Sequence, residues 1–391
     1  MSQPTIAVAR PAPWRNARVR RALGQVLFLL IVGWALRELY LNLEFGTRRI
    51  GQGLSYDFLQ TRSGIPIKEG IDYNPNQSYL KAYLVALVNT LRVAGVGIVL
   101  ASVLGLVVGV ARLSTNWLVR KTAQVYVEAI RNTPVLIQII FWYVAVILTL
   151  PLIGGEPVAG VFVSNRGTAI PWLRLDAGAG VLGLLLLVAL VVGAAAWLWR
   201  TRYNERTGRP HHRVRWSIGA FLLLAAVGFL VTGGPIHLEM PELAGRRIRG
   251  GFQVSSEFTA VLVGLVVYTA AFIAEIVRGS ILAVDKGQKE AAMALGFTPF
   301  QQLRLVVLPQ AARIAIPPIN SQFLNLTKNS SLAVAVGYPE LASVSSTIIN
   351  QAGRAFQVTI MVMLTYMTLS LAISFVMNVL NRSVALRGVR R

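Results

Sequence analysis

The sequence predicts an all-α protein, a polytopic membrane helix bundle with about eight spans. Of the 391 residues, 54% are apolar and only 14% are charged, and the mean hydropathy is +0.58. Apolar runs of about 20 residues, the length that crosses ~30 Å of hydrocarbon as a helix, recur along the chain. These runs are continuous, whereas the strands of a membrane β-barrel alternate polar and apolar residues. The composition excludes a disordered chain and an ordinary soluble domain.

The eight predicted spans cover 22–41, 83–111, 135–150, 179–199, 217–231, 258–277, 314–336 and 356–380. The first span follows a cluster of arginines, as a signal peptide would. Its apolar core is too long for a signal peptide, and Arg37 to Tyr40 offer no small-residue cleavage site, so we expect a retained span. In the second span Ala101, Gly105 and Gly109 lie four residues apart on one helix face, a pattern that permits close helix packing in lipid.

The distribution of Lys and Arg predicts that both termini are cytoplasmic. With this orientation the cytoplasmic segments hold 24 of the 38 basic residues, and the outer loops hold 11. Those segments are 1–21, 112–131, 200–215, 278–313 and 382–391. Because short basic loops favour the cytoplasmic side, the net charge of +22 is interpreted as a topology signal, and no nucleic-acid partner is expected. The run 200–215 is also basic enough to attract anionic lipid headgroups.

No residues of this chain form a recognisable catalytic or metal site. The chain has no cysteine, which excludes a thiolate nucleophile or metal ligand. Its three histidines, His211, His212 and His237, have no carboxylate or Cys partners at a metal-binding spacing. The sequence also lacks the Gly-x-x-x-x-Gly-Lys-Ser/Thr loop that binds nucleotide phosphates. We therefore expect no catalytic residue, no metal and no cofactor on this chain.

The predicted cytoplasmic loop 278–313 has a local pattern of its own. Residues 286–295 are helix formers that stop at Gly296, a residue suited to the left-handed conformation after a helix end. Thr298 can cap a second helix that begins with a proline, and Pro309 ends that helix or joins it to the next span. The loop is therefore expected to form a compact protrusion of two capped, short helices.

This loop resembles the EAA loop of bacterial ABC importer permeases. The matching positions are Glu290, Ala291, Ala292, Gly296, Leu308 and Pro309. In that family the loop forms coupling helices that dock in a cleft on the ATPase subunit, and the resemblance implies the same role for these six residues. These residue types suit docking on a partner, since alanines let a short helix lie close to the partner surface and Glu290 offers a charge that fixes the orientation of the helix.

Further motifs are similar to the branch of this family that imports polar and general L-amino acids, in particular to the long general L-amino-acid permeases of Gram-negative bacteria. They lie at 131–134, 274–279, 286–288 and 328–332. The resemblance implies an ABC type I importer permease fold with its core in 83–150 and 258–381. The chain departs from five-span members by an extra first span within 22–82 and by a helical pair inserted among the outer loops of 151–257. The ends, 1–21 and 382–391, are basic cytoplasmic segments.

Polar residues in the seventh span mark a candidate translocation path. An ionisable group in a span costs about 2.5–3.5 kcal/mol on insertion scales, and Pro317-Pro318 frees backbone groups near the start of this span. Lys328 can bind the carboxylate of an amino acid, and Glu275 its ammonium group. The candidate path residues are Glu275, Asn325, Lys328, Asn329, Ser330 and Ser331. In the structural alternative, Lys328 pairs with Glu275 and the Asn and Ser side chains bond helix to helix.

The resemblance implies a permease subunit in the bacterial inner membrane that moves polar or general L-amino acids from periplasm to cytoplasm. It implies an ABC ATPase dimer that carries ATP and Mg, a second permease of a different sequence, and a periplasmic amino-acid-binding protein, which the outer loops 42–82 and 151–178 could meet. The alternative is an ion-coupled secondary amino-acid transporter, a class that often shows internal repeats, and none is seen here. An enzyme acting on lipid is disfavoured because the 16 acidic residues are scattered.

Overall fold

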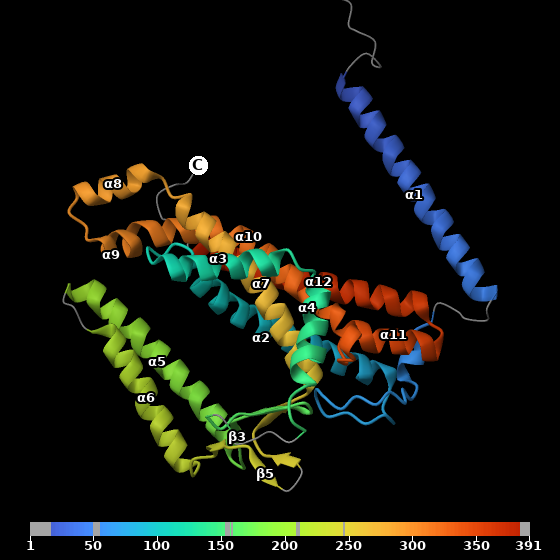
Figure 1. Ribbon diagram of the computed structural model, residues 1–391, viewed down its shortest axis with the longest axis horizontal. Helices are drawn as coiled ribbons and strands as arrows, with labels where there is room; N and C mark the ends of the chain where they lie inside the picture. Colours follow the sequence, from blue (N-terminus) through green and yellow to red (C-terminus); the bar gives the residue numbers. More distant parts are fainter. Residues whose placement is uncertain are drawn as a thin grey trace, which may run out of the picture.

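The computed structural model describes residues 17–49, 55–152, 157, 159–208, 212–244 and 247–383 (Figure 1). Most of the predicted basic segments 1–21 and 382–391, and 209–211 with His211, lie outside the described residues. The rest is mostly helical, which confirms the predicted all-α membrane bundle. Six described helices are long and apolar enough to cross a membrane, and up to eight spans result if each of two bent helix pairs is one span.

The spans form in the predicted order, with longer bounds than hydropathy alone indicates. The unbroken ones are α1 (Ala17–Arg49), α2 (Tyr79–Ala111), α5 (Ala179–Thr207), α6 (Arg213–Val231), α7 (Ser256–Leu282) and α12 (Ala355–Ser383). One bent pair joins α3 (Trp117–Arg131) to α4 (Val135–Phe141) and η3 (Trp142–Ile147) at 104°. The other joins the helical run 299–336 to α11 (Leu341–Ala352) at 56°.

Helix α7 lies at the centre of the bundle and packs against α2, α3, α4 and α10. The small-residue face of α2 packs closely against another helix, as predicted, and the structure identifies this partner as α7. A Cβ atom added to Gly105 would lie 2.6 Å from Cβ of Ile273, and one added to Gly109 would lie 2.8 Å from the carbonyl oxygen of Ala274. Larger residues at these two positions would push the helices apart, so the glycines permit the close approach that builds the main hydrophobic core.

Two helices were not predicted. The segment 112–131, expected only as a cytoplasmic connection, contains α3, which Asn116 caps and which buries Val127 against α7. The predicted outer loop 337–355 contains α11, whose apolar face packs on α2. Both helices are too short or too polar for a hydropathy window of span length. Their stability comes from burying one face, which depends on neighbours distant in sequence.

The second helix of the loop 278–313 and the predicted span 314–336 form one helical run. It consists of α9 (Pro299–Gln301), η4 (Gln302–Val307), α10 (Leu308–Asn329) and η5 (Ser330–Val336). Of the two predicted outcomes at Pro309, joining rather than ending is the one observed. Segment η4 is π-helical, and this wide turn precedes the proline, which has no N–H to donate. The helix also continues through Pro317 and Pro318.

Short strands, which were not predicted, order the outer loops. Strands β1 (Phe162–Ser164), β2 (Gly167–Ile170) and β7 (Phe252–Val254) form an antiparallel sheet. Two further antiparallel pairs are β3 (Trp172–Leu175) with β4 (Ile236–Glu239) and β5 (Glu242–Ala244) with β6 (Arg247–Arg249). Because β3 precedes α5 and β4 follows α6, their pairing closes the base of the inserted helical pair (Figure 1).

Candidate functional site

The loop 278–313 folds into the two predicted helices, and local signals end and start them. Helix α8 (Lys286–Ala294) is capped by Asp285, whose carboxylate accepts the Gly287 N–H at 2.6 Å. At its end Gly296 has φ +77°, its N–H donates to the Met293 carbonyl (2.9 Å), and the Phe297 N–H donates to the Ala292 carbonyl (3.1 Å). These two bonds form a Schellman motif, which needs a left-handed residue at the position of Gly296.

The second helix starts with a complete capping box. The Gln301 N–H donates to Thr298 Oγ1 at 3.3 Å, and the Thr298 N–H donates to Gln301 Oε1 at 2.9 Å, with Pro299 at the first helical position. Three of the four unpaired N–H groups at this helix end are thereby satisfied or absent. The elbow between α8 and α9 is thus defined by bonds within ten residues of each other.

The coupling candidates divide between an inner and an outer side of this element. Ala292 is buried, whereas Glu290, Ala291, Gly296 and Leu308 are exposed and Pro309 is half-buried. Gln310, near the start of α10, donates from Nε2 to Gln288 Oε1 at 3.2 Å. This bond links α10 to α8. Helix α8 packs on η4, so Ala292 lies on an inner side of this element and the exposed residues form its outer side.

Large apolar side chains also lie exposed beside Glu290, and sequence reasoning missed them. Leu295 is 75% and Phe300 is 67% exposed, and Met293 is exposed as well. Exposed apolar residues in a well-ordered loop indicate a contact surface for another protein. The signal was present in the sequence, since large apolar residues occur in a segment predicted to be cytoplasmic. Only the structure shows that these side chains are exposed.

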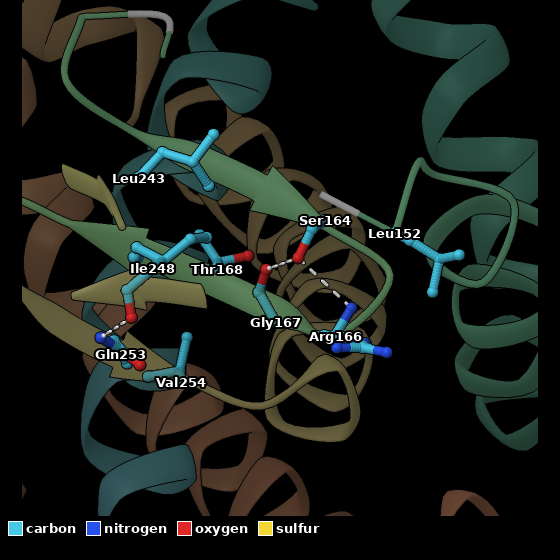
Figure 2. Close-up of a pocket in the computed structure, with 10 residues that line it drawn as sticks. Leu152, Ser164, Arg166, Gly167, Thr168, Leu243, Ile248, Gln253 and Val254 are labelled. Atoms are coloured by element: carbon cyan, nitrogen blue, oxygen red, sulfur yellow. Dashed lines mark hydrogen bonds between the residues drawn. The ribbon is translucent and has the colours of Figure 1, made fainter. Parts of the chain in front are cut away.

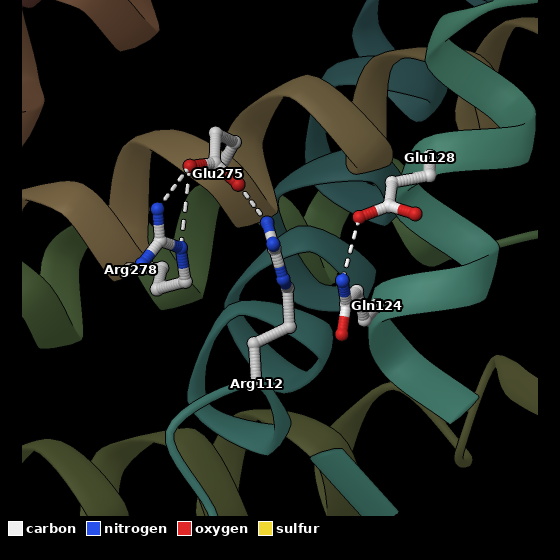
Figure 3. A network of polar contacts seen from close by, with 5 residues as sticks. All are labelled: Arg112, Gln124, Glu128, Glu275 and Arg278. Carbon is white, nitrogen blue, oxygen red and sulfur yellow. Dashed lines mark hydrogen bonds and ion pairs between the residues drawn. The ribbon is translucent and has the colours of Figure 1, made fainter. Parts of the chain in front are cut away.

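Glu275 takes part in an ion cluster at the end of α7 that leads into this loop (Figure 3). Its carboxylate accepts from Arg278 at 2.6 Å and forms an ion pair with Arg112, the residue that follows α2. In α3, Glu128 accepts from Gln124 at 2.7 Å. Among the described residues Glu275 is thus paired with two arginines, and the pairing of Lys328 with Glu275 that the sequence left open is not observed.

Lys328 lies at a cavity of 540 Å³ between the end of α10 and α12. Ser331 lines it too, and α12 contributes Met363, Tyr366 and Ser370. The Ser331 hydroxyl donates to the Lys328 carbonyl at 2.8 Å. This cavity is open on one side, so the Lys328 ammonium group lies where a small anionic group can reach it.

The remaining path candidates lie in different environments. Ser330 is buried and donates to the Thr327 carbonyl at 2.7 Å, which is a structural role in the turn from α10 to η5. Asn325 is exposed and Asn329 is half-buried, and neither lines the cavity that contains Lys328. Of the six candidates, the structure therefore brings only Lys328 and Ser331 together at one cavity.

Sequence reasoning missed the group that supports the wall of this cavity. Glu340 is fully buried, caps α11 by accepting the N–H groups of Ala342 (2.9 Å) and Ser343 (2.7 Å), and accepts from the Tyr366 hydroxyl at 3.2 Å. The N-terminus of α11 stabilises this carboxylate. The bond from Tyr366 holds this side chain at the cavity wall. In the sequence, an acidic residue directly before an apolar run could have indicated the helix cap.

A second, smaller cavity follows the same seam between α10 and α12. It measures 200 Å³ and is lined by Pro317 and Asn320 of α10 and by Ser374 and Asn378 of α12. Oδ1 of Asn320 is buried without a hydrogen-bond partner in the described part of the chain. Polar side chains therefore line the α10–α12 seam at two levels.

A half-buried carboxylate, that of Glu69, joins two segments of the outer face. The Ser255 N–H donates to Glu69 Oε1 at 2.6 Å and the Ser255 hydroxyl donates to Oε2 at 2.9 Å, which attaches the loop before α2 to the start of α7. Burial raises the pKa of Glu69, against the two bonds from Ser255, which lower it. The attachment fixes the loop over the outer end of the bundle.

A cavity of 220 Å³ lies among the outer strands (Figure 2). Its polar groups bind one another: the Ser164 hydroxyl donates to the Gly167 carbonyl at 3.0 Å, and Gln253 donates from Nε2 to the Ile248 carbonyl at 3.0 Å. The cavity therefore has few free polar groups for a ligand, and these bonds serve to order the strands.

Comparisons with known proteins agree with this architecture. Residues 216–386 match the family model described as "Binding-protein-dependent transport system inner membrane component". The chain is 40% identical to the general L-amino acid transport system permease protein AapQ of Rhizobium johnstonii, over 95% of this chain and 94% of that protein. It is 40% identical to the putative amino-acid ABC transporter permease protein YhdX of Escherichia coli, over 99% of each.

A third relative is the glutamate/glutamine/aspartate/asparagine transport system permease protein BztB of Rhodobacter capsulatus, which is 39% identical over 93% of this chain and 92% of that protein. These alignments cover nearly the whole of this chain and of each of the three relatives. Members of the family are membrane subunits whose ATPase is a separate chain, which excludes the ion-coupled carrier. The chain thus belongs to the family of binding-protein-dependent transport system inner membrane components, the multi-pass permease subunits of ABC transporters.

Proposed function

We propose that this permease imports polar or general L-amino acids from the periplasm to the cytoplasm. The observation that carries the proposal is the similarity over nearly the whole chain to relatives whose names state amino-acid transport. The excess of Lys and Arg in alternate loops supports an orientation with both termini in the cytoplasm. The core then consists of 83–150 and 258–381, to which 22–82 and 151–257 are additions, with basic ends at 1–21 and 382–391.

The coupling surface of this proposal is the outer side of α8 and α9, with Glu290, Ala291 and the elbow at Gly296. An ATPase dimer that carries ATP and Mg binds there, and the exposed Leu295 and Phe300 supply apolar contact area. Because α9, η4 and α10 form one helical run, a displacement of the loop is transmitted directly to the helix that contains Lys328. This is a rigid-body mechanism, with Ala292 and Pro309 on the supporting side and Leu308 exposed on the outer side.

The translocation path of this proposal follows the α10–α12 seam, which faces a second permease of a different sequence. Lys328 binds the carboxylate of the amino acid, and the hydroxyl groups of Ser331 and Ser370 assist it. Glu275 already has two arginine partners, so the ammonium group of the substrate binds other acceptors along the seam, and Glu275 acts at the cytoplasmic end. A periplasmic amino-acid-binding protein delivers the substrate to the outer loops.

The coupling proposal is tested by co-purification with the ATPase in mild detergent. We expect Glu290→Lys and Gly296→Arg to leave membrane insertion intact and to lose ATPase recovery and uptake together. Glu205→Lys is the matched control, because it makes the same charge change at an exposed position at the end of α5. Wild-type uptake by the inserted Glu290→Lys and Gly296→Arg proteins would refute the coupling assignment.

The path proposal is tested by Lys328→Ala in proteoliposomes. We expect the apparent KM for the amino acid to rise about tenfold, the effect of one charge-assisted hydrogen bond, with ATPase recovery unchanged. Lys121→Ala, at an exposed position of α3, is the matched control. Wild-type kinetics for Lys328→Ala would remove this residue from the path without affecting the coupling assignment.

A further inference from the structure

The inserted pair α5–α6 is a peripheral hairpin with its own surface. Its two helices pack chiefly on each other, and Figure 1 shows the pair beside the α2–α7 core, joined to it through the outer strands. The end of α5 and the start of α6 lie on the same side of the molecule as α8 and α9. Most large apolar side chains of the pair are exposed, as expected for helices that face lipid.

An apolar groove of 450 Å³ runs between the two helices in the half near α8 and α9. Leu190, Ala194 and Leu198 of α5 and Ile218 and Phe221 of α6 line it. Gly193 contributes no side chain, and its carbonyl accepts the Ser217 hydroxyl at 2.8 Å, so the polar groups of the floor are paired with each other. The groove therefore offers an acyl chain an apolar bed at membrane depth.

A fixed cation lies two residues beyond Leu198, the last residue of α5 that lines the groove. The Arg200 guanidinium lies over the ring of Trp216 from α6, 4.5 Å from the centroid, and 4.8 Å from that of Trp199. These cation–π contacts hold the side chain across the hairpin. Its Nε–H has no acceptor within the described residues. A guanidinium held in place with an unused donor is suited to bind an anionic oxygen.

The surroundings of Arg200 are strongly basic. Between Trp199 and Trp216 the sequence has six arginines and only one acidic residue, Glu205. Two tryptophans at this level are typical of the boundary between hydrocarbon and headgroups. The groove therefore lies in the acyl region, and Arg200, Arg202 and Arg206 at the end of α5 lie at the headgroup level.

We propose that the α5–α6 groove and Arg200 form a binding site for an anionic phospholipid, with an acyl chain in the groove and the phosphate at Arg200. Basic pockets between spans bind such headgroups, and arginine pairs with phosphate through its planar fork. A protein helix in the groove would place apolar side chains beside Arg200, unless it carried a carboxylate at that level. A phospholipid supplies both an apolar chain and an anionic oxygen.

The test uses the full-length permease co-purified with its partner subunits. Native mass spectrometry measures binding of phosphatidylglycerol and of phosphatidylcholine with the same acyl chains. We expect Arg200→Gln to weaken phosphatidylglycerol binding about tenfold, which corresponds to about 1.4 kcal/mol, and Ala194→Phe, which fills the groove, to weaken both lipids. Arg206→Gln is the matched control, because it removes an equal charge at an exposed position of the same helix, and it should change binding less than twofold.

Four results would overturn the proposal. Wild-type phosphatidylglycerol binding by Arg200→Gln and Ala194→Phe would show that the lipid binds elsewhere. Equal losses for Arg200→Gln and Arg206→Gln would indicate diffuse attraction to the basic surface. Full competition by soluble glycerol phosphate would indicate a site for a small anion, and complete disulfide crosslinking of Ile218→Cys to a cysteine in the second permease would show that protein covers the groove.

Discussion

The elbow at Gly296 allows the coupling assignment to be tested by backbone conformation alone. Gly296 has φ +77°, and no atom lies within 4 Å of a Cβ built on it. The change Gly296→Ala therefore introduces no clash, and its only cost is the left-handed conformation, about 1–2 kcal/mol for a residue with a Cβ. Asparagine adopts this conformation more readily, so Gly296→Asn should cost clearly less.

This cost converts into a loss of coupling. If the ATPase binds the folded elbow, 1–2 kcal/mol reduces the apparent affinity of the ATPase by a factor of about 5–30. Uptake at limiting ATPase concentration should fall in proportion. Gly279→Ala is the matched control, because Gly279 also has no atom within 4 Å of an added Cβ but lies inside α7, where alanine is favoured by up to about 1 kcal/mol.

The assay titrates the purified ATPase onto the permease in nanodiscs and measures uptake in proteoliposomes. The expected order of affinity is wild type and Gly279→Ala highest, Gly296→Asn intermediate and Gly296→Ala lowest. Wild-type affinity for Gly296→Ala would refute the reasoning that the elbow must keep its left-handed residue. An equal loss of affinity for Gly296→Asn and Gly296→Ala would show that the added side chain disturbs the contact with the ATPase, and that the backbone conformation is not the cause.

Three further predictions concern the bundle. Gly105→Ala should be less stable than Gly95→Ala by about 1–3 kcal/mol in SDS unfolding titrations, because only the former overpacks against α7; equal stabilities would contradict the packing. The raised pKa of Glu69 means that the folded state binds this proton more tightly, so its contribution to stability is present at low pH and is lost as pH rises through the folded pKa. Glu69→Gln should flatten the decline in stability that begins above about pH 4, the ordinary pKa of a glutamate; an unchanged slope would assign the decline to another group. Glu275→Gln leaves the half-buried Arg112 without its counter-charge and should lower the free energy of unfolding by about 1–3 kcal/mol. A double-mutant cycle with Arg112→Gln measures the interaction between the two residues. Additive effects would show that they do not interact.

Local signals explain why the loop 278–313 was predictable. A Schellman end at Gly296 and a capping box at Thr298 each depend on residues within one or two turns, so residue type and spacing suffice to predict them. The same holds for the small-residue face at Gly105 and Gly109, where the pattern predicts close packing. It does not say which helix is the partner, and α7 became known only from the fold.

Features that depend on distant neighbours were not predictable in the same way. Helix α3 is stable because it buries Val127 on α7, and the outer strands pair across the inserted hairpin, as β3 does with β4. The apolar residues of α8 and α9 are visible in the sequence, but the sequence does not show that their side chains are exposed on one surface. In each case the stabilising contact joins segments separated by many residues, and hydropathy windows contain no such information.

By itself the sequence determined the membrane class, the order of the spans, the two capped helices of the loop and the family resemblance, because all of these depend on composition and short-range patterns. Only the tertiary structure decided that Glu275 pairs with Arg112, that Lys328 and Ser331 share a cavity with α12, and that Arg200 lies over Trp216, two residues beyond the last residue of α5 that lines an apolar groove. The physical reason is that the function of a charged group or a cavity depends on the side chains that face it, and in these cases those side chains belong to another helix.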